Sequence, residues 1–285
     1  MLKPGDKIAI VACSNAQPIS NKHKIGELLK TIESLGIIPV CSDFIYEKYS
    51  VFSGEAVDKA KVLMKFYLEP QIKAIFDISG GNIANEILPY LDFQIIKNHY
   101  KPFFGYSDLT TIINALYSKT GHPSYLYQIR NLVYDKKDEQ QERFTHSLIQ
   151  NSTDIYDINY TFIQGKRMEG IVVGGNIRCL LKLAGTPYMP DFKNKILFLE
   201  SFSGDAGLMT TYLNQYKQMG VFQKVNGILL GTFTEMEKDK IQPTMEELVV
   251  KIVGDEKLPI AKTDEVGHGV NSKCLVIGKE YKLNK

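Results

Sequence analysis

The sequence of 285 residues is 44% hydrophobic and 23% charged, which predicts a globular protein with a full core, built as one large α/β domain or two medium ones. Its formal net charge of +2 and its scattered lysines argue against a nucleic-acid-binding surface. No apolar stretch approaches the length needed to span a membrane.

The first half of the chain alternates short apolar runs with stretches of helical periodicity. The continuous run at residues 7–13 (KIAIVAC) is typical of a strand buried on both faces of a parallel sheet. A helix is predicted at 21–35, ended by Gly36. The remaining segments predict strands at 37–41, 73–78 and 101–105 and a helix at 54–68. This order predicts a doubly wound parallel sheet, in which ligands bind beyond the carboxyl ends of the strands.

One of those strand ends carries a serine. The run at 101–105 leads through Tyr106 to Ser107 and Asp108, and a helical pattern that extends to Leu116 begins at once. A serine at a strand–turn–helix corner is the arrangement of a nucleophile elbow, where backbone N–H groups of the helix N-terminus can hold an oxyanion. The second glycine of the usual elbow is missing. The sequence therefore leaves open that Ser107 or Asp108 is simply the cap of the helix.

The pattern loosens between residues 134 and 166, into a charged helix at 137–150 and a polar stretch with β character, and then resumes. We expect strands at 170–173, 195–199, 226–230 and 259–261, a last strand at 273–277, and helices at 177–184, 205–219 and 244–253. The chain thus divides into an N-terminal Rossmann-like domain at 1–150, a linker at 151–165 and a smaller C-terminal α/β domain at 166–285.

Two further side chains have the chemistry to work with Ser107. Glu200 ends an apolar strand, where a carboxylate can orient a histidine and stabilise its cation. The alternative for Glu200 is a strand-end glutamate that faces water or caps the next helix. His268 lies between two glycines, in a loop with room to turn the imidazole toward a cleft, and the alternative is an ordinary surface histidine. The order Ser107, Glu200, His268 is that of α/β-hydrolase triads.

Other polar motifs have simpler interpretations. Four histidines lack metal-ligand spacing, so we interpret them as structural and expect no metal: His23, His99, His122 and His146. Gly-Gly-Asn turns begin at Gly80 and Gly174, and neither fits a dinucleotide or nucleoside-triphosphate motif. The first turn is placed to aim a backbone N–H at the site, whereas Gly174 and Gly175 are interpreted as a tight strand-to-helix turn.

Five segments together resemble the consecutive blocks of the LD-carboxypeptidase family of serine peptidases, which includes muramoyltetrapeptide carboxypeptidases and microcin C self-immunity peptidases. They are residues 78–92 (ISGGNIANEILPYLD), 101–110 (KPFFGYSDLT), 172–187 (VVGGNIRCLLKLAGTP), 195–200 (KILFLE) and 267–269 (GHG). The likeness spans nearly the whole chain, in the order that the family has.

The resemblance implies the site residues. It implies a catalytic triad of Ser107, Glu200 and His268, and an oxyanion hole made by the N–H groups of Gly81 and Asp108. We also expect substrate contacts from three neighbouring positions, Gly80, Asn82 and Tyr106. The resemblance further implies a Rossmann-like N-terminal domain, a C-terminal domain with the site at their junction, and a homodimer.

The implied reaction is hydrolysis of the amide between an L-configured centre and a terminal D-amino acid in murein tetrapeptide, as in peptidoglycan recycling, with no cofactor. Two alternatives stay open. One is the same chemistry on a peptidyl- or aminoacyl-nucleotide, as in microcin immunity. The other is a non-catalytic module that binds a small peptide or sugar. In every case the expected partner is a small molecule rather than a nucleic acid or a membrane.

The sequence departs from the family in two places. Members usually carry a segment like Thr-Phe-His-Gly-Pro after the nucleophile helix, whereas residues 124–128 read Ser-Tyr-Leu-Tyr-Gln, in a part of the chain that lines the cleft in relatives. The chain also has no tryptophan, the residue associated with nucleotide stacking in the immunity branch. The available substitutes are Tyr125, Tyr127 and Tyr188.

The four cysteines lie far apart, without a ligand or redox motif, at Cys13, Cys41, Cys179 and Cys274. Three of them adjoin apolar runs, so we expect buried free thiols in a reducing compartment. The N-terminal segment has neither the apolar length nor the cleavage signature of a secretion signal. We therefore expect a cytoplasmic protein.

Overall fold

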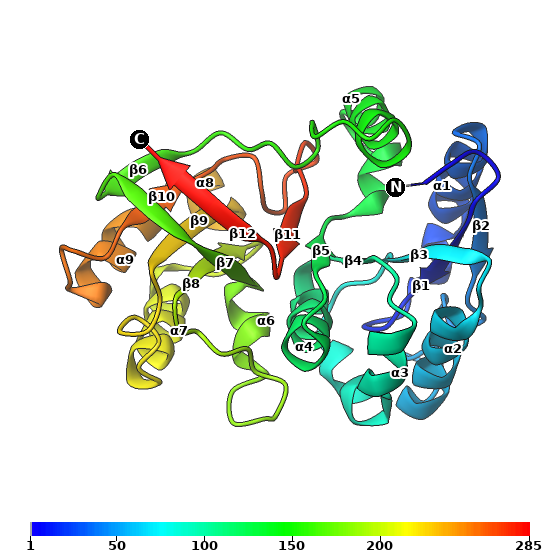
Figure 1. Cartoon of the computed structure of the whole chain (residues 1–285), viewed down its shortest axis with the longest axis horizontal. Coiled ribbons are helices and arrows are strands. Elements are labelled where there is room, and N and C mark those ends of the chain that lie inside the picture. The colour runs from blue at the N-terminus through cyan, green and yellow to red at the C-terminus, as the bar shows by residue number, and fades with distance from the viewer. Residues whose placement is uncertain (1) are drawn as a thin grey trace.

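Two six-stranded sheets organise the computed structural model, which describes residues 2–285. The sheets lie side by side in Figure 1, with the N-terminal half of the chain on the right and most of the C-terminal half on the left. Residue 1 of the predicted first domain lies outside the described residues. Among residues 2–285, no helix has the length and apolar character needed to cross a bilayer.

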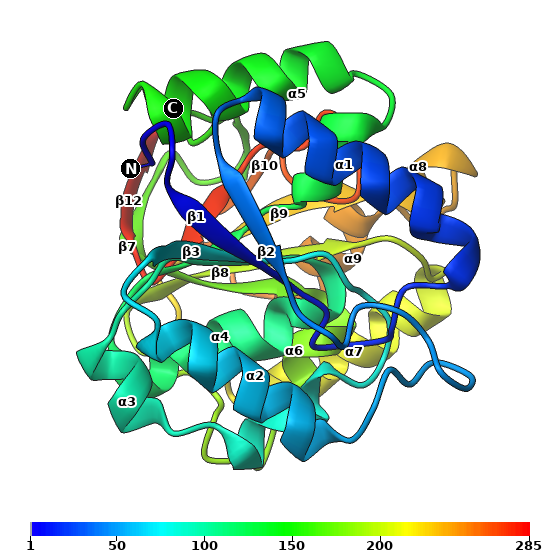
Figure 2. The same ribbon diagram turned by 90° about the vertical axis from the view of Figure 1, so that its right-hand side faces the viewer.

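The first sheet has the strand order β11-β5-β4-β3-β1-β2 and is parallel except for β11, which runs antiparallel to β5. Its elements are β1 (Lys7–Val11), α1 (Lys22–Ser34), β2 (Ile38–Cys41), α2 (Ala56–Leu68), β3 (Ile72–Asp77), α3 (Phe93–Asn98), β4 (Phe103–Gly105), α4 (Thr110–Thr120), β5 (Ser124–Leu126), α5 (Lys137–Phe144) and β11 (Leu275–Ile277). Helices α1 and α5 cover one face and α2, α3 and α4 the other (Figure 2). Because both faces are covered, Ile8, Ala9 and Ile10 have no exposed surface. The predicted doubly wound sheet is confirmed.

The second sheet has the order β12-β7-β8-β9-β10-β6, with a parallel centre and an antiparallel strand at each edge. Its elements are β6 (Thr161–Gln164), β7 (Arg167–Asn176), α6 (Ile177–Leu181), β8 (Lys195–Ser201), α7 (Ala206–Gln218), β9 (Gly227–Phe233), α8 (Thr234–Lys238), α9 (Met245–Val253), β10 (Ile260–Lys262) and β12 (Glu280–Asn284). This second α/β unit is also as predicted.

The edges of the two sheets differ from the prediction. The strand predicted at 273–277 is not the last one, because β12 follows it, and it pairs with β5 of the first sheet. In β12 only Leu283 is buried, so this edge strand lacks the apolar run that would have indicated it. Strand β6, within the predicted linker, pairs with β10. The domain boundaries stay a prediction. Strand β6 of the predicted linker belongs to the second sheet, and β11 of the predicted C-terminal domain belongs to the first.

All four cysteines are free, and Cys13, Cys179 and Cys274 are buried as expected. Cys41 is exposed instead. It ends β2, which forms the outer edge of the first sheet.

Helix α4 joins the two sheets by packing directly on β7. The amide of Asn114 donates to the carbonyl of Gly174 at 2.8 Å and accepts from its N–H at 2.9 Å. A Cβ at Gly175 would lie 2.5 Å from Thr110 Oγ1, so this glycine allows the close approach. The interpretation of Gly174 and Gly175 as a turn is therefore wrong. They lie inside β7, at the contact between the sheets.

We expect Asn114→Ala to lower the free energy of unfolding by about 2 to 4 kcal/mol, because it leaves the buried N–H and carbonyl of Gly174 without partners. Asn214→Ala in α7 is the matched control. Asn214 also donates to a threonine carbonyl four residues back, but no interaction carries it to the other sheet. Urea unfolding followed by circular dichroism measures both variants. Equal losses would show that the contact between α4 and β7 contributes nothing specific.

Candidate active site

Ser107 stands on a strained corner between β4 and α4. Its φ is 55°, a left-handed conformation that a residue other than glycine adopts only under constraint. A single 3₁₀ turn (Ser107–Leu109) then leads into α4. On the preceding strand, a Cβ at Gly105 would lie 2.7 Å from Leu109 Cβ, so the corner folds tightly over a glycine. Such a corner presents the serine hydroxyl at the sheet edge, as in a nucleophile elbow.

The side chains of Ser107 and Asp108 do not cap the helix, so the cap interpretation is wrong. The Asp108 carboxylate is fully buried and accepts hydrogen bonds from Ser14 Oγ at 2.6 Å and from the N–H of Ala84 at 2.8 Å. Its other oxygen forms an ion pair with Lys182, just after α6. A buried carboxylate needs such compensation. Asp108 thus fixes the serine corner to the loop after β1, to the 3₁₀ helix that follows β3 (Ala84–Tyr90) and to the second sheet.

Glu200 and His268 meet beside this corner. Glu200, near the end of β8, is fully buried, and its Oε2 lies 2.5 Å from Nδ1 of His268, whose side chain is 10% exposed. The loop brings the imidazole inward at Gly267, where a Cβ would lie 1.9 Å from Thr232 Oγ1. The carboxylate at Nδ1 favours the tautomer with the proton on that nitrogen and leaves Nε2 as the basic position. Glu200 therefore does not face water.

Aromatic rings hold the imidazole of His268 in place. The Tyr106 ring lies 4.4 Å and the Phe202 ring 5.1 Å from it, measured between ring centroids. Burial, followed by the charge of Glu200, raises the pKa of the Tyr106 hydroxyl well above its usual value, so that hydroxyl stays neutral. Tyr106 thus packs against the histidine and adds no charge to the site.

The glycine turn after β3, residues 80–82, is held by side chains on two sides. Gly81 has a φ of 122°, and a Cβ there would lie 2.2 Å from Asn15 Cγ. The same asparagine accepts the N–H of Asn82 at 2.9 Å. From α6, Arg178 donates to the carbonyl of Gly81 at 3.2 Å and to Oδ1 of Asn82 at 2.7 Å. The turn is therefore held rigidly beside Ser107, since a Cβ at Gly80 would lie 3.8 Å from Ser107 Cβ.

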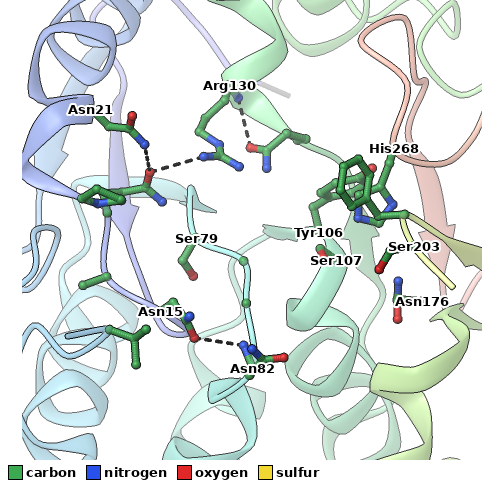
Figure 3. Close-up of a pocket in the computed structure, with 18 of the residues that line it drawn as sticks. Asn15, Asn21, Ser79, Asn82, Tyr106, Ser107, Arg130, Asn176, Ser203 and His268 are labelled. Carbon is green, nitrogen blue, oxygen red and sulfur yellow. Dashed lines mark hydrogen bonds between the residues drawn. The ribbon is translucent and has the colours of Figure 1, made fainter. Parts of the chain in front are cut away.

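One pocket, with a volume of about 1060 Å³, is lined by most of the residues predicted for the triad, the oxyanion hole and the substrate contacts. Ser107, His268, Tyr106 and the glycine turn line its wall, whereas Glu200 and Asp108 are buried behind it. Figure 3 shows Ser107 and His268 on the same side of the pocket, with Asn176 and Ser203 close by. Within residues 2–285, no cluster of three or more His, Cys, Asp or Glu side chains is arranged to hold a metal ion.

Several lining residues had no signal in the sequence, among them Asn15, Arg130 and Arg178. Each forms hydrogen bonds with residues far away in the chain, as Asn15 does with the glycine turn. A single polar residue in a sequence does not indicate which distant residue it will contact. The tyrosines that could replace the missing tryptophan do not line the pocket. Tyr125 in β5 and Tyr127 just after it are buried, and Tyr188 packs on Phe93.

Models of one family match both halves of the chain. The LD-carboxypeptidase N-terminal domain matches residues 8–127, and the LD-carboxypeptidase C-terminal domain matches residues 169–283. These two ranges contain all the residues predicted for the triad, the oxyanion hole and the substrate contacts.

Individual relatives are distant but align over most of their length. YocD of Bacillus subtilis, which is named a carboxypeptidase, is 29% identical over 94% of this chain and 90% of its own. The murein tetrapeptide carboxypeptidase of Pseudomonas aeruginosa is 23% identical, over 88% of this chain and 85% of its own. The structure of MccF in complex with glutamyl sulfamoyl guanosine superposes with a TM-score of 0.87 at 20% identity, over 100% of this chain and 97% of MccF.

We expect Lys182→Met to lower the free energy of unfolding by about 3 to 5 kcal/mol, because it leaves the Asp108 carboxylate buried without its counter-ion. Lys119→Met, an exposed lysine of α4, is the control and should change stability by less than about 0.5 kcal/mol. Equal stability of the two variants in urea would contradict a structural role for the ion pair.

Proposed function

The chain belongs to the LD-carboxypeptidase family, and from that premise we propose that it is a serine carboxypeptidase that uses Ser107, Glu200 and His268 as a catalytic triad. The observation that carries the proposal is the 2.5 Å contact between Glu200 and His268 Nδ1, in a pocket that also presents Ser107 on its strained corner. A carboxylate, an imidazole and a serine in this order form the relay that activates a hydroxyl for acyl transfer.

In the proposed mechanism, His268 Nε2 takes the proton of Ser107 as Oγ attacks the scissile carbonyl. Glu200 holds the ring through Nδ1–H and stabilises the imidazolium. The backbone N–H groups of Gly81 and Asp108 stabilise the oxyanion. The imidazolium then gives its proton to the leaving amine, and a water molecule activated by the same ring hydrolyses the acyl-enzyme.

The proposed substrate is a murein tetrapeptide, cut at the amide between an L-configured centre and a terminal D-amino acid. The name of the Pseudomonas aeruginosa relative supports this choice. The pocket does so too, because it is large enough for a peptide and carries two arginines, Arg130 and Arg178, against one acidic residue, Glu47. Such a charge balance suits a substrate with a free carboxylate.

The second candidate is a peptidase that cleaves an aminoacyl-nucleotide, as the whole-chain fold likeness to MccF suggests. Phe202 and Tyr212 line the pocket and offer aromatic surfaces for a base. Cleavage rates for murein tetrapeptide and for an aminoacyl sulfamoyl adenosine, measured side by side, separate the two candidates. Hydrolysis of neither would favour a binding module.

Two further features of the proposal concern the setting of the enzyme. We infer a cytoplasmic location from the four free thiols, which suit a reducing compartment. We infer a homodimer from the family alone, and light scattering of the purified chain tests it.

We expect Ser107→Ala to lower kcat/KM on murein tetrapeptide by about ten-thousand-fold, and Glu200→Gln by a similar factor, because the triad acts as a unit. Ser118→Ala in α4 should keep full activity, since Ser118 lies outside the pocket and its hydroxyl donates to the carbonyl of Met189. Chromatographic assay of the released amino acid measures all three. Full turnover by the Ser107 variant would rule out the serine mechanism.

We expect Gly81→Ala to lower kcat by about 100-fold, because the new Cβ displaces the turn that donates to the oxyanion. Gly185→Ala also introduces a side chain at a positive φ, of 76°, but its Cβ would meet nothing within 4 Å. Both variants should lose stability, and only the first should lose activity. Unchanged kcat in Gly81→Ala would remove this turn from the oxyanion hole.

A further inference from the structure

Arg130 lies on the pocket wall with most of its hydrogen-bonding capacity unused. Its guanidinium has five N–H donors, and within residues 2–285 it forms one bond, from NH1 to Gln17 Oε1 at 3.3 Å. Its Nε is buried and has no partner among residues 2–285. Figure 3 shows the side chain between Asn21 on one side of the pocket and Tyr106 and His268 on the other. A guanidinium is seldom left so incompletely paired in a folded protein.

No carboxylate neutralises this arginine. In the described part of the chain it forms no ion pair, and burial lowers its pKa. The one carboxyl group whose charge acts on it among the described residues, Asp77, has its oxygens taken by Ser79 and by the backbone N–H of Cys13. Glu47, the acidic residue of the pocket, accepts the N–H of Ile19. A partly desolvated cation without a counter-ion is unfavourable by itself and becomes favourable when an anion binds.

A second unused donor lies beside Arg130. The Nε2 of Gln128 is buried and has no partner in the described part of the chain, while its Oε1 accepts the backbone N–H of Arg130 and so fixes the two residues to each other. Both residues line the pocket. Gln128 ends the segment in which the sequence departs from the family, and Arg130 follows it by two residues.

The position of Arg130 relative to the nucleophile fits the product side of the reaction. Arg130 lines the same pocket as Ser107, Tyr106 and His268, and Figure 3 shows its side chain on the wall next to Tyr106 and His268. In a terminal amino acid the carboxylate is separated from the scissile nitrogen by a single carbon. Its binding site must therefore lie in the same pocket as the nucleophile.

We propose that the guanidinium of Arg130, with the amide of Gln128, binds the terminal carboxylate of the substrate and so selects peptides with a free C-terminus. This inference rests on the proposed peptidase function. Arginine can bind a carboxylate through two parallel N–H···O hydrogen bonds. A neutral C-terminal amide would leave those donors unpaired and the positive charge of the guanidinium without a counter-ion.

The test measures binding in a Ser107→Ala background, where no turnover interferes. The probes are diacetyl-L-lysyl-D-alanine and its C-terminal amide, titrated by calorimetry. We expect the acid to bind at least about 10-fold more tightly than the amide, since a hydrogen bond to a charged group has about that effect. Adding Arg130→Gln should abolish the difference, whereas Arg167→Gln, an exposed arginine of β7, should retain it.

Two outcomes overturn the proposal. One is an absence of acid preference in the Ser107→Ala background, and the other is a preference that persists in Arg130→Gln. Turnover by the wild-type chain is measured separately. If the acid preference depends on Arg130 but no peptide is hydrolysed, the proposed function fails and the carboxylate site stands.

Arg130→Lys guards against misfolding of the glutamine variant. It keeps the charge but not the planar fork, so we expect an acid preference reduced by about 3-fold or more rather than abolished. A cooperative thermal transition close to that of the parent shows that each variant is folded. An unchanged preference in the folded lysine variant would contradict a paired contact by the guanidinium.

Discussion

A single buried carboxylate holds together the segments that form the site. Asp108 accepts hydrogen bonds from the loop after β1 and from the start of the 3₁₀ helix after β3, and it forms an ion pair with Lys182, just after α6. Because an unpaired carboxylate in this position would be strongly unfavourable, the serine corner has one stable position relative to the second sheet. The same packing maintains the left-handed backbone of Ser107.

Each sheet supplies half of the proposed machinery. Ser107 and the glycine turn extend from the first sheet, and Glu200 extends from the second. His268, which contacts Glu200, lies in the loop that connects β10 of the second sheet with β11 of the first. The relay is complete only when the sheets are docked, and the bonds of Asn114 to β7 serve that purpose. The pocket lies where the two units meet, so any change in their docking would alter the proposed nucleophile and its proposed base together.

The parts that the sequence predicts well are those with a local signal. Continuous apolar runs indicated the parallel strands except β5, which has only three residues and was not predicted. Ser107, Glu200 and His268 all stand at strand ends or between glycines. The edge strand β12 escaped prediction because only one of its residues is buried. Lys182 has no local signal either, because its partner Asp108 lies 74 residues away and a lysine near a helix end usually faces water. Tertiary contacts of this kind cannot be deduced from spacing.

The most direct test of the proposed triad is to look for its covalent intermediate. The enzyme is mixed with an ester that carries the acyl group of the peptide substrate and whose acyl-enzyme is hydrolysed slowly. The mixture is quenched in acid and analysed by mass spectrometry. The triad predicts a mass increase equal to the acyl group, on the peptide that contains Ser107, and none in His268→Ala. Two results would contradict the triad. One is hydrolysis of the ester with the adduct on another side chain, and the other is a burst of released alcohol with no adduct on the enzyme.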